Sequence, residues 1–433
     1  MLLISFLSNV SLPVCCGLIS ITTMMNRKTE ALIMASFVFP SLSTSLGFGG
    51  WDIHSKAPLS VAHVDGYHRG HHNQRERGRV SLSSSRFEDN SQKISTSEIM
   101  TSDTATKLAD IFNNPPPSFE VGGSTDATRI LDSYNILGEC ILFDDLRNEV
   151  VWTDIDGKQF HRLSLDTSKH SIIELPKMLC AFALRPKGED GYVFAWEDGF
   201  QLYDVDQGKE LSDMSEGEDV NPSKLPTRLN DGRVDPTGKH FICGGHYGDV
   251  KDMYMKVYKC TFRGDNENGE QKKLVHEAIV DKIQTTNSIC WSNDGQTMFL
   301  ADSPTRTIFK HDYDQENGTL SNERPLRTLD IGVPDGSCVD SNGNVWNALW
   351  RNGAGPSKVQ CFDSSTGEIL YTINMPDSTS QVTCCCFGGP DLDILFISTA
   401  HIHRDRQKEP YGGCVYAAKV GVKGCLEKRF CGV

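Results

Sequence analysis

Two carboxylate and two carboxamide side chains recur at corresponding positions of an internal repeat. Each copy of the repeat has an apolar residue, a turn rich in Pro, Asn, Asp or Gly, and an apolar strand. Counting four residues back from the start of each copy gives Glu139, Cys180, Asn230, Asn287, Asp335 and Thr383. Carboxylate and carboxamide oxygens suit a hard divalent cation such as Ca²⁺ or Mg²⁺, whereas zinc and copper favour His and Cys ligands. The pattern indicates a metal site with open positions for water or substrate. The alternative is that these residues cap strands in turns, where Asn and Asp are common.

The repeat also predicts the elements that would bring these side chains together. Its copies start 41 to 57 residues apart, at Phe143, Leu184, Val234, Trp291, Val339 and Phe387. Units of this length with about four short strands are typical of propeller blades. We therefore expect an all-β fold, a six-bladed β-propeller whose innermost strands line a central channel that holds the metal site. Two further strand-like segments, residues 129–137 and 412–420, are expected to pair and close the ring.

Composition separates the chain into two regions. Residues 1–125 include an apolar presequence-like start and Ser-, His- and Pro-rich tracts, so we expect a disordered N-terminal region followed by the propeller at 126–433. No apolar run is long enough for a membrane helix. A cytoplasmic location is the default expectation, with plastid or secretory targeting by the N-terminal segment as alternatives. The net charge of −14 argues against nucleic-acid binding. The fifteen cysteines, three of them adjacent at 384–386, are expected to be mostly reduced and buried rather than a disulfide framework.

Several motifs in the second region resemble a known family. "RLNDGRVDPTGK", "VPDGSCVDSNGNVW" and "VTCCCFGGPDLDILFISTA" follow one another in the order found in the regucalcin (senescence marker protein)/gluconolactonase/luciferin-regenerating family of six-bladed propellers. The resemblance covers the chain from about Leu137 to its last residue. It implies that Glu139, Asn287 and Asp335 bind the metal, that Asp335 is also the catalytic acid/base, and that Arg228 and Asn230 bind substrate.

The sequence departs from the family pattern at two places. The family usually has Pro after the first glutamate, where this chain reads "GECILF". After the third anchor strand the family's lactonases carry a substrate-binding Glu, whereas this chain reads "GGHYGDVKD". His246, Tyr247 or Asp249 are the candidates to face the pocket instead.

The function that the resemblance implies is metal-dependent hydrolysis of a sugar lactone such as gluconolactone. The cofactor would be one divalent metal ion, Ca²⁺ first, with Zn²⁺, Mg²⁺ and Mn²⁺ as alternatives. We expect a small-molecule lactone as the partner, no nucleic acid, and a monomer. Two alternatives remain open: a calcium-binding regulatory protein of the regucalcin type without strong lactonase activity, and a phosphotriesterase-like hydrolase.

Overall fold

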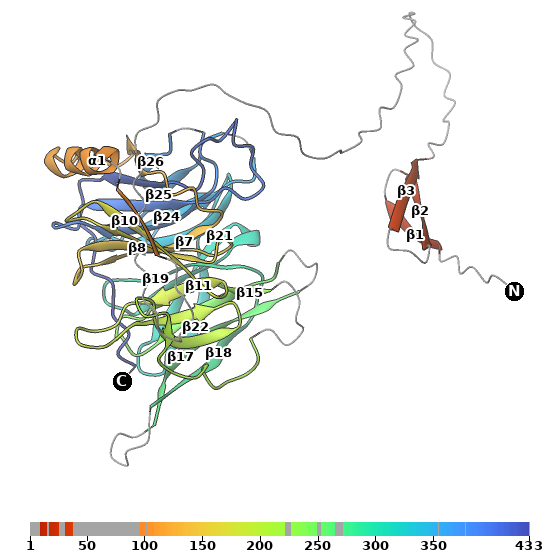
Figure 1. Ribbon diagram of the computed structural model, residues 1–433, viewed down its shortest axis with the longest axis horizontal. Helices are drawn as coiled ribbons and strands as arrows, with labels where there is room; N and C mark the ends of the chain where they lie inside the picture. The colour runs from red at the N-terminus through yellow and green to blue at the C-terminus, as the bar shows by residue number, and fades with distance from the viewer. Residues whose placement is uncertain are drawn as a thin grey trace, which may run out of the picture. The chain divides into compact units, whose positions relative to one another are not determined.

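The computed structural model describes residues 9–14, 17–25, 31–37, 96–100, 102–220, 227–248, 253–264, 272–353, 355–376 and 378–432. The chain divides into two units, Met1–Glu76 and Arg77–Val433. In the first unit, β1 (Asn9–Val14), β2 (Gly17–Met25) and β3 (Ala31–Phe37) form a three-stranded antiparallel sheet (Figure 1). No helix among the described residues is both long and apolar enough to cross a membrane.

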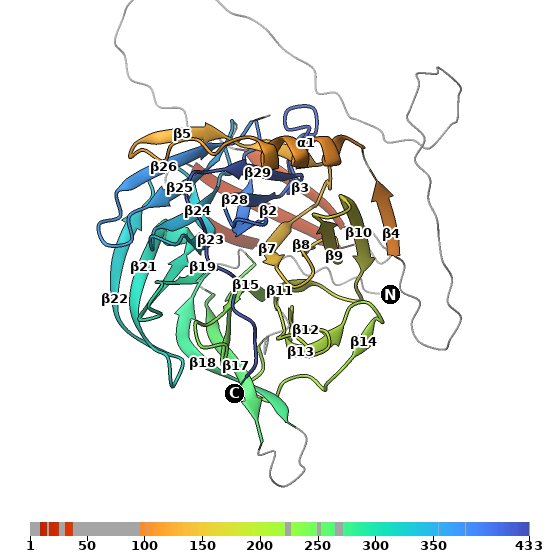
Figure 2. The same cartoon turned by 90° about the vertical axis from the view of Figure 1, so that its left-hand side faces the viewer.

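The second unit is a six-bladed β-propeller, as predicted (Figure 2). Blade 1 has β7 (Gly138–Asp144), β8 (Glu149–Asp154), β9 (Gln159–Ser164), β10 (Lys169–Glu174) and, at its outer edge, β4 (Thr96–Met100). Blade 2 has β11 (Leu179–Ala183), β12 (Tyr192–Trp196), β13 (Gly199–Asp204) and β14 (Lys209–Glu210). Blade 3 has β15 (Arg228–Val234), β16 (Phe241–His246), β17 (Met255–Arg263) and β18 (Lys273–Ile283).

The remaining blades follow the same meander. Blade 4 has β19 (Thr286–Trp291), β20 (Thr297–Asp302), β21 (Thr307–Asp314) and β22 (Thr319–Thr328), with a short 3-10 helix, η2 (Ser303–Thr305), after β20. Blade 5 has β23 (Val333–Val339), β24 (Val345–Trp350), β25 (Lys358–Phe362), β26 (Ile369–Asn374) and β5 (Gly123–Asp126). Blade 6 has β27 (Val382–Gly388), β28 (Ile394–Thr399), β29 (Val415–Lys419) and β6 (Thr128–Leu131).

The ring closes where the two ends of the propeller sequence meet in blade 6. Strand β6 pairs antiparallel with β29, with Leu131 opposite Val415. The two segments expected to close the ring therefore do so. Because an edge strand that is paired no longer exposes its backbone groups, this closure also protects the last blade.

The propeller unit begins before the boundary expected at residue 126. Strand β4 pairs with β10, β5 pairs in parallel with β26, and α1 (Ser102–Asn113) packs Leu108 and Ile111 against blade 6. The expected disorder therefore does not hold for these elements, and much of the rest of residues 1–125 lies outside the described residues. Edge strands need few apolar residues, which is why this segment has little hydrophobic pattern.

The last described residues, 421–432, run along the end of the channel at which the innermost strands finish. Arg429 donates hydrogen bonds to Asp144 and Asp145 of blade 1, and the Phe430 amide donates to the Leu184 carbonyl of blade 2. Glu427 approaches Arg233 of blade 3 to 3.3 Å. This C-terminal segment therefore ties several blades together at the end opposite to the site described below.

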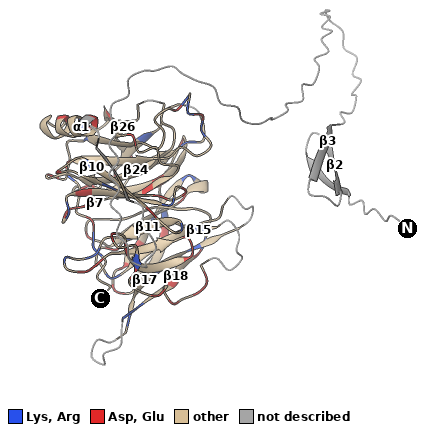
Figure 3. Ribbon diagram, in the orientation of Figure 1, with Lys and Arg blue, Asp and Glu red and all other residues tan. Residues whose placement is uncertain are grey.

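The thirteen cysteines in the described part of the chain are all free thiols, and eleven of them are buried. This agrees with the expectation of reduced, buried cysteines there. Figure 3 shows acidic and basic residues interspersed along the strands and loops of the blades.

A buried histidine pair in blade 1 gives the fold an acid-sensitive element. His161 Nδ1 lies 3.0 Å from His170 Nε2, and both rings stack on Trp152. Burial lowers the pKa of His170 to about 4, and burial together with His170 lowers the pKa of His161 well below its usual range. Both rings are therefore neutral in the fold at pH 7.

We predict that this pair makes the protein less stable as the pH falls from about 6.5 towards 4. The unfolded chain takes up protons near pH 6.5 and the folded one does not, so stability is full above 6.5 and is lost below it. Denaturant titrations at pH 7.5 and 4.5 should show that His170→Gln removes roughly 2 to 3 kcal/mol of the acid-induced loss. His403→Gln, at an exposed histidine, serves as the control. An equal acid-induced loss in wild type and His170→Gln would contradict this prediction.

Candidate active site

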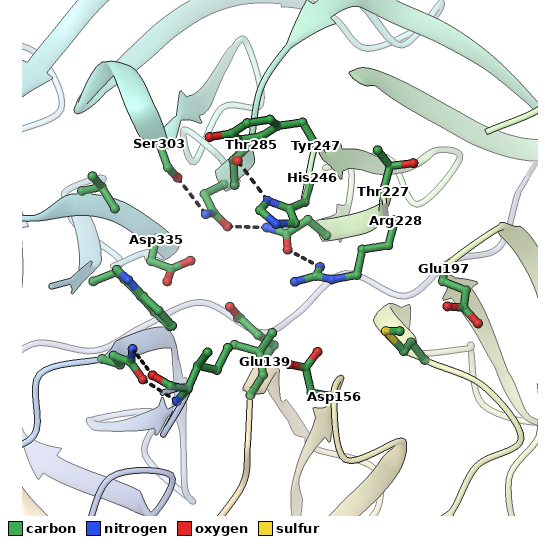
Figure 4. Close-up of a pocket in the computed structure, with 18 of the residues that line it drawn as sticks. Glu139, Asp156, Glu197, Thr227, Arg228, His246, Tyr247, Thr285, Ser303 and Asp335 are labelled. Atoms are coloured by element: carbon green, nitrogen blue, oxygen red, sulfur yellow. Dashed lines mark hydrogen bonds between the residues drawn. The ribbon is translucent and has the colours of Figure 1, made fainter. Parts of the chain in front are cut away.

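The innermost strands bring the repeated oxygen-bearing residues to one end of the channel. Glu139, Asn230, Asn287 and Asp335, each from a different blade, line one cavity of about 1160 Å³ (Figure 4). Cys180 and Thr383 occupy the same register but do not line it. The Thr383 hydroxyl instead donates to the Gly138 carbonyl, so it links blade 6 to blade 1. The register thus identifies four cavity residues and two structural ones.

The backbone is irregular at each of these positions. The pairing of every innermost strand with its neighbour shifts there, for example between Glu139 and Leu142 and between Pro334 and Ser337. Cys140 and Ser288, which follow Glu139 and Asn287, have φ of 48° and 61°, in the left-handed region. Bulges and left-handed residues re-aim side chains, and both are enriched at functional sites.

A glycine after the aspartate allows neighbouring innermost strands to approach each other. A Cβ on Gly336 would lie 2.5 Å from Cys384 Sγ, closer than atoms can pack. In the "PDG" motif, Asp335 therefore faces the cavity, and Gly336 lets the innermost strands of neighbouring blades pack closely. In the "NDG" motif the glycine serves pairing within blade 3, because a Cβ on Gly232 would lie 2.8 Å from Cβ of its cross-strand partner Cys243.

The two asparagine amides are held in fixed orientations. Asn230 Nδ2 donates to the Thr286 carbonyl at 2.8 Å and to Asn287 Oδ1 at 3.1 Å. Asn287 Nδ2 donates to Ser303 Oγ at 2.8 Å, and that hydroxyl donates to the Pro334 carbonyl at 2.7 Å. Each amide oxygen accepts one protein hydrogen bond, Asn230 Oδ1 from Arg228 and Asn287 Oδ1 from Asn230, so each keeps a lone pair for a ligand.

Among the described residues, the two carboxylates of the set form no ion pair, and Arg228 offsets only part of the rise in their pKa. Glu139 and Asp335 are 9% and 4% exposed, and Asp335 Oδ1 has no hydrogen-bond partner. Burial raises the pKa of Glu139 to about 8, with Asp231 adding to the rise. Burial, Glu139 and Asp231 raise the pKa of Asp335 well above its usual range. Buried carboxylates are costly unless paired with a cation, so a divalent metal ion fits this donor set.

The cavity combines carboxylate and amide oxygens, and this combination determines which metal ions it favours. Among the described residues, no group of three or more His, Cys, Asp or Glu side chains is placed to hold a metal. Two carboxylates with two amide oxygens instead form an all-oxygen set, which matches the preference of Ca²⁺, Mg²⁺ or Mn²⁺ rather than copper.

Arg228 lies at the start of β15 beside Asn230. Its guanidinium donates to Asn230 Oδ1 at 2.5 Å and to the Leu229 carbonyl at 2.9 Å, and the residue lines the cavity. The repeat register did not identify Arg228, because it stands two residues before the repeated position; only the family resemblance did.

The stretch that departs from the family pattern contributes to the cavity in part. His246 and Tyr247 line it, and His246 Nδ1 lies 3.1 Å from Thr285 Oγ1. Asp249, the third candidate, lies outside the described residues.

Five acidic residues near the site were not found from the sequence: Asp156, Glu197, Asp198, Asp219 and Asp231. Asp231 accepts a hydrogen bond from the Ile289 amide at 2.9 Å, and burial raises its pKa. Asp156 and Glu197 line the cavity from turns outside the innermost strands. Such turns differ in length between blades, so no repeated offset points to them.

Comparison with known proteins gives consistent matches over the propeller. The family described as SMP-30/Gluconolactonase/LRE-like region matches residues 137–401. Regucalcin of Danio rerio is 30% identical over 303 residues, covering 68% of this chain and 95% of that protein. A 6-deoxy-6-sulfogluconolactonase of Pseudomonas putida is 29% identical over 305 residues, covering 69% of this chain and 96% of that protein. The crystal structure of a calcium-binding protein, regucalcin, from Agrobacterium tumefaciens superposes with a TM-score of 0.60 at 25% identity, covering 71% of this chain and 99% of that one.

Proposed function

Because the chain belongs to the SMP-30/gluconolactonase/LRE-like family, we propose that it is a divalent-metal-dependent hydrolase that opens sugar lactones. One of the relatives above is named as a lactonase, and another is described as a calcium-binding protein. The observation that carries the proposal is the convergence of Glu139, Asn287 and Asp335 on one cavity, with Asp335 Oδ1 buried and without a partner.

Glu139, Asn287 and Asp335 are the residues proposed to hold the metal, with Ca²⁺ as the first candidate and Mg²⁺, Mn²⁺ and Zn²⁺ as the others. When bound, such an ion polarises a lactone carbonyl and makes a water molecule more acidic. Asn230 lies next to Asn287 and fixes its amide by the 3.1 Å hydrogen bond, so it supports the ligand set as well as facing the cavity.

Asp335 is proposed as the acid/base of the reaction. One of its carboxylate oxygens accepts the proton of the attacking water, and the same group then returns that proton to the ring oxygen that leaves. Arg228 and Asn230 are proposed to hold hydroxyl groups of the substrate. Arg228 is suited to this because its guanidinium keeps N–H groups beyond those bonded to Leu229 and Asn230. These contacts would orient the ester carbon toward the water.

The proposal is tested with the purified full chain on aldonolactones, other lactones and a phosphotriester. We expect hydrolysis of at least one sugar lactone, lost after chelation and restored by one of Ca²⁺, Mg²⁺, Mn²⁺ and Zn²⁺. Metal binding without turnover of any substrate would instead favour the calcium-binding regulatory alternative. Turnover of the phosphotriester alone would favour the phosphotriesterase-like one. Either result overturns the proposal.

A further inference from the structure

The cavity has an acidic wall that the proposed reaction does not use. Asp156 lies in the turn after β8 of blade 1, and Glu197 lies in the turn after β12 of blade 2. Figure 4 shows both carboxylates beside the cavity, with Asp156 near Glu139 and Glu197 on the side of Arg228. Burial raises the pKa of the Cys180 thiol to about 12; Glu197 and Asp156 add to the rise, and Arg228 opposes it.

These two carboxylates are without partners in the described part of the chain. No hydrogen bond or ion pair reaches the side chain of either. The neighbouring Asp198 differs, because Lys177 Nζ donates to it at 2.6 Å. Asp156 is exposed and Glu197 half-buried, so both present their charge to the cavity space rather than to a protein cation.

The cationic side chains that line the cavity compensate only part of this negative charge. Arg228 donates to the neutral oxygens of Asn230 and Leu229, so its own charge remains. Arg404 donates to the Arg351 carbonyl at 2.9 Å and lies 4.0 Å from the buried Glu409. A divalent metal at the proposed centre would be balanced by Glu139 and Asp335. The two unpartnered carboxylates then outnumber the one guanidinium of Arg228, so the charge that remains in the cavity is negative.

We propose that Glu197 and Asp156 are specificity-determining residues, which accept hydrogen bonds from hydroxyl groups of neutral, polyhydroxylated lactones and exclude lactones that carry a phosphate, sulfonate or carboxylate. This inference rests on the proposed lactonase function and deepens it. The unpartnered Asp335 Oδ1 in the same cavity is the second, independent sign that the space is built for a ligand. A carboxylate accepts a hydrogen bond from a hydroxyl group and repels an anionic substituent. The same two side chains therefore favour neutral lactones and disfavour anionic ones.

The test compares a neutral and an anionic form of one substrate: glucono-δ-lactone and its 6-phosphate, each with the metal present and corrected for spontaneous opening. We expect wild type to favour the neutral lactone in kcat/KM by roughly tenfold or more. Glu197→Gln should reduce that ratio, and Glu197→Gln with Asp156→Asn should reduce it by roughly tenfold through faster turnover of the phosphate. The amides keep a hydrogen-bond acceptor, so turnover of the neutral lactone should change less than the ratio does.

Glu210→Gln is the matched control, because Glu210 is exposed on β14 and outside the cavity lining. It removes the same charge and should leave the ratio unchanged, and thermal melts should show that every variant is folded. An equal or reversed preference in wild type, or a ratio that the double variant does not change, overturns the inference.

Failure of the proposed function would be seen separately, as no turnover of either lactone with any metal. The inference is then measured by calorimetry with the non-hydrolysable pair 1,5-anhydroglucitol and its 6-phosphate. Tighter binding of the neutral sugar, by a margin that Glu197→Gln reduces, supports it. Tighter binding of the phosphate, or binding of neither sugar, overturns it.

Discussion

Replacing Asp335 with asparagine should lower kcat/KM for lactone opening by roughly 10³-fold while the propeller remains folded. The asparagine keeps the shape of the side chain and an oxygen for the cavity, but it cannot accept the proton of the attacking water. Raising the metal concentration should not restore turnover, because the missing group is the base. Initial-rate kinetics across a metal titration measure this directly.

Thermal melts of the metal-free Asp335→Asn protein supply the structural control. Glu139 and Asp231 raise the pKa of Asp335 alongside burial, so the asparagine removes repulsion between buried carboxylates. The metal-free variant should therefore melt at the wild-type temperature or above it. Asp190→Asn, at an exposed position outside the cavity lining, should leave both turnover and melting unchanged. Normal lactone hydrolysis by Asp335→Asn would remove Asp335 from the mechanism.

The features predicted well from the sequence are those that a repeat imposes. An apolar strand that follows a polar turn recurs because each blade must cover its neighbour, and Trp291 and Val339 mark the ends of two such innermost strands. Equal offsets from these marks occupy equal places around the channel, which is why Asn287 and Asp335 could be placed in one cavity. The same offset could not show that Thr383 serves blade packing, because its role depends on which neighbour its hydroxyl reaches.

The features that were missed depend on irregular structure. Asp231 follows Asn230, and strict alternation along a strand would turn it away from the channel; the shift between Leu229 and Gly232 alters that. Glu197 lies in a turn whose length no other blade repeats. Strand β5 alternates between half-buried and exposed residues and has no apolar side chain, so nothing in its sequence marks it as part of the propeller.

Replacing Glu139 with glutamine should weaken metal binding by roughly 100-fold, because the set keeps its oxygens but loses one of its two proposed charges. The ion then stabilises the fold less, since stabilisation depends on the ratio of free metal to Kd; a 100-fold loss corresponds to about 2.7 kcal/mol at 298 K. Calorimetric titration with Ca²⁺ and melts with and without the ion measure both quantities. Glu210→Gln, which removes a surface charge instead, should leave the affinity unchanged.

Metal rescue separates the proposed roles of Glu139 and Asp335. Turnover by Glu139→Gln should recover as the metal concentration rises, whereas turnover by Asp335→Asn should not.

Glu139 also makes the stability of the metal-free protein depend on pH. Without metal, the folded protein retains a proton on Glu139 up to a pKa of about 8, whereas the unfolded chain loses it near 4.5. The contribution of Glu139 to stability therefore falls as the pH rises from about 4.5 to 8. Glu139→Gln should remove this fall from denaturant titrations of the metal-free protein, and bound metal should reduce it in wild type. If wild type and Glu139→Gln bind Ca²⁺ equally well, Glu139 is not a ligand and the proposed centre is wrong.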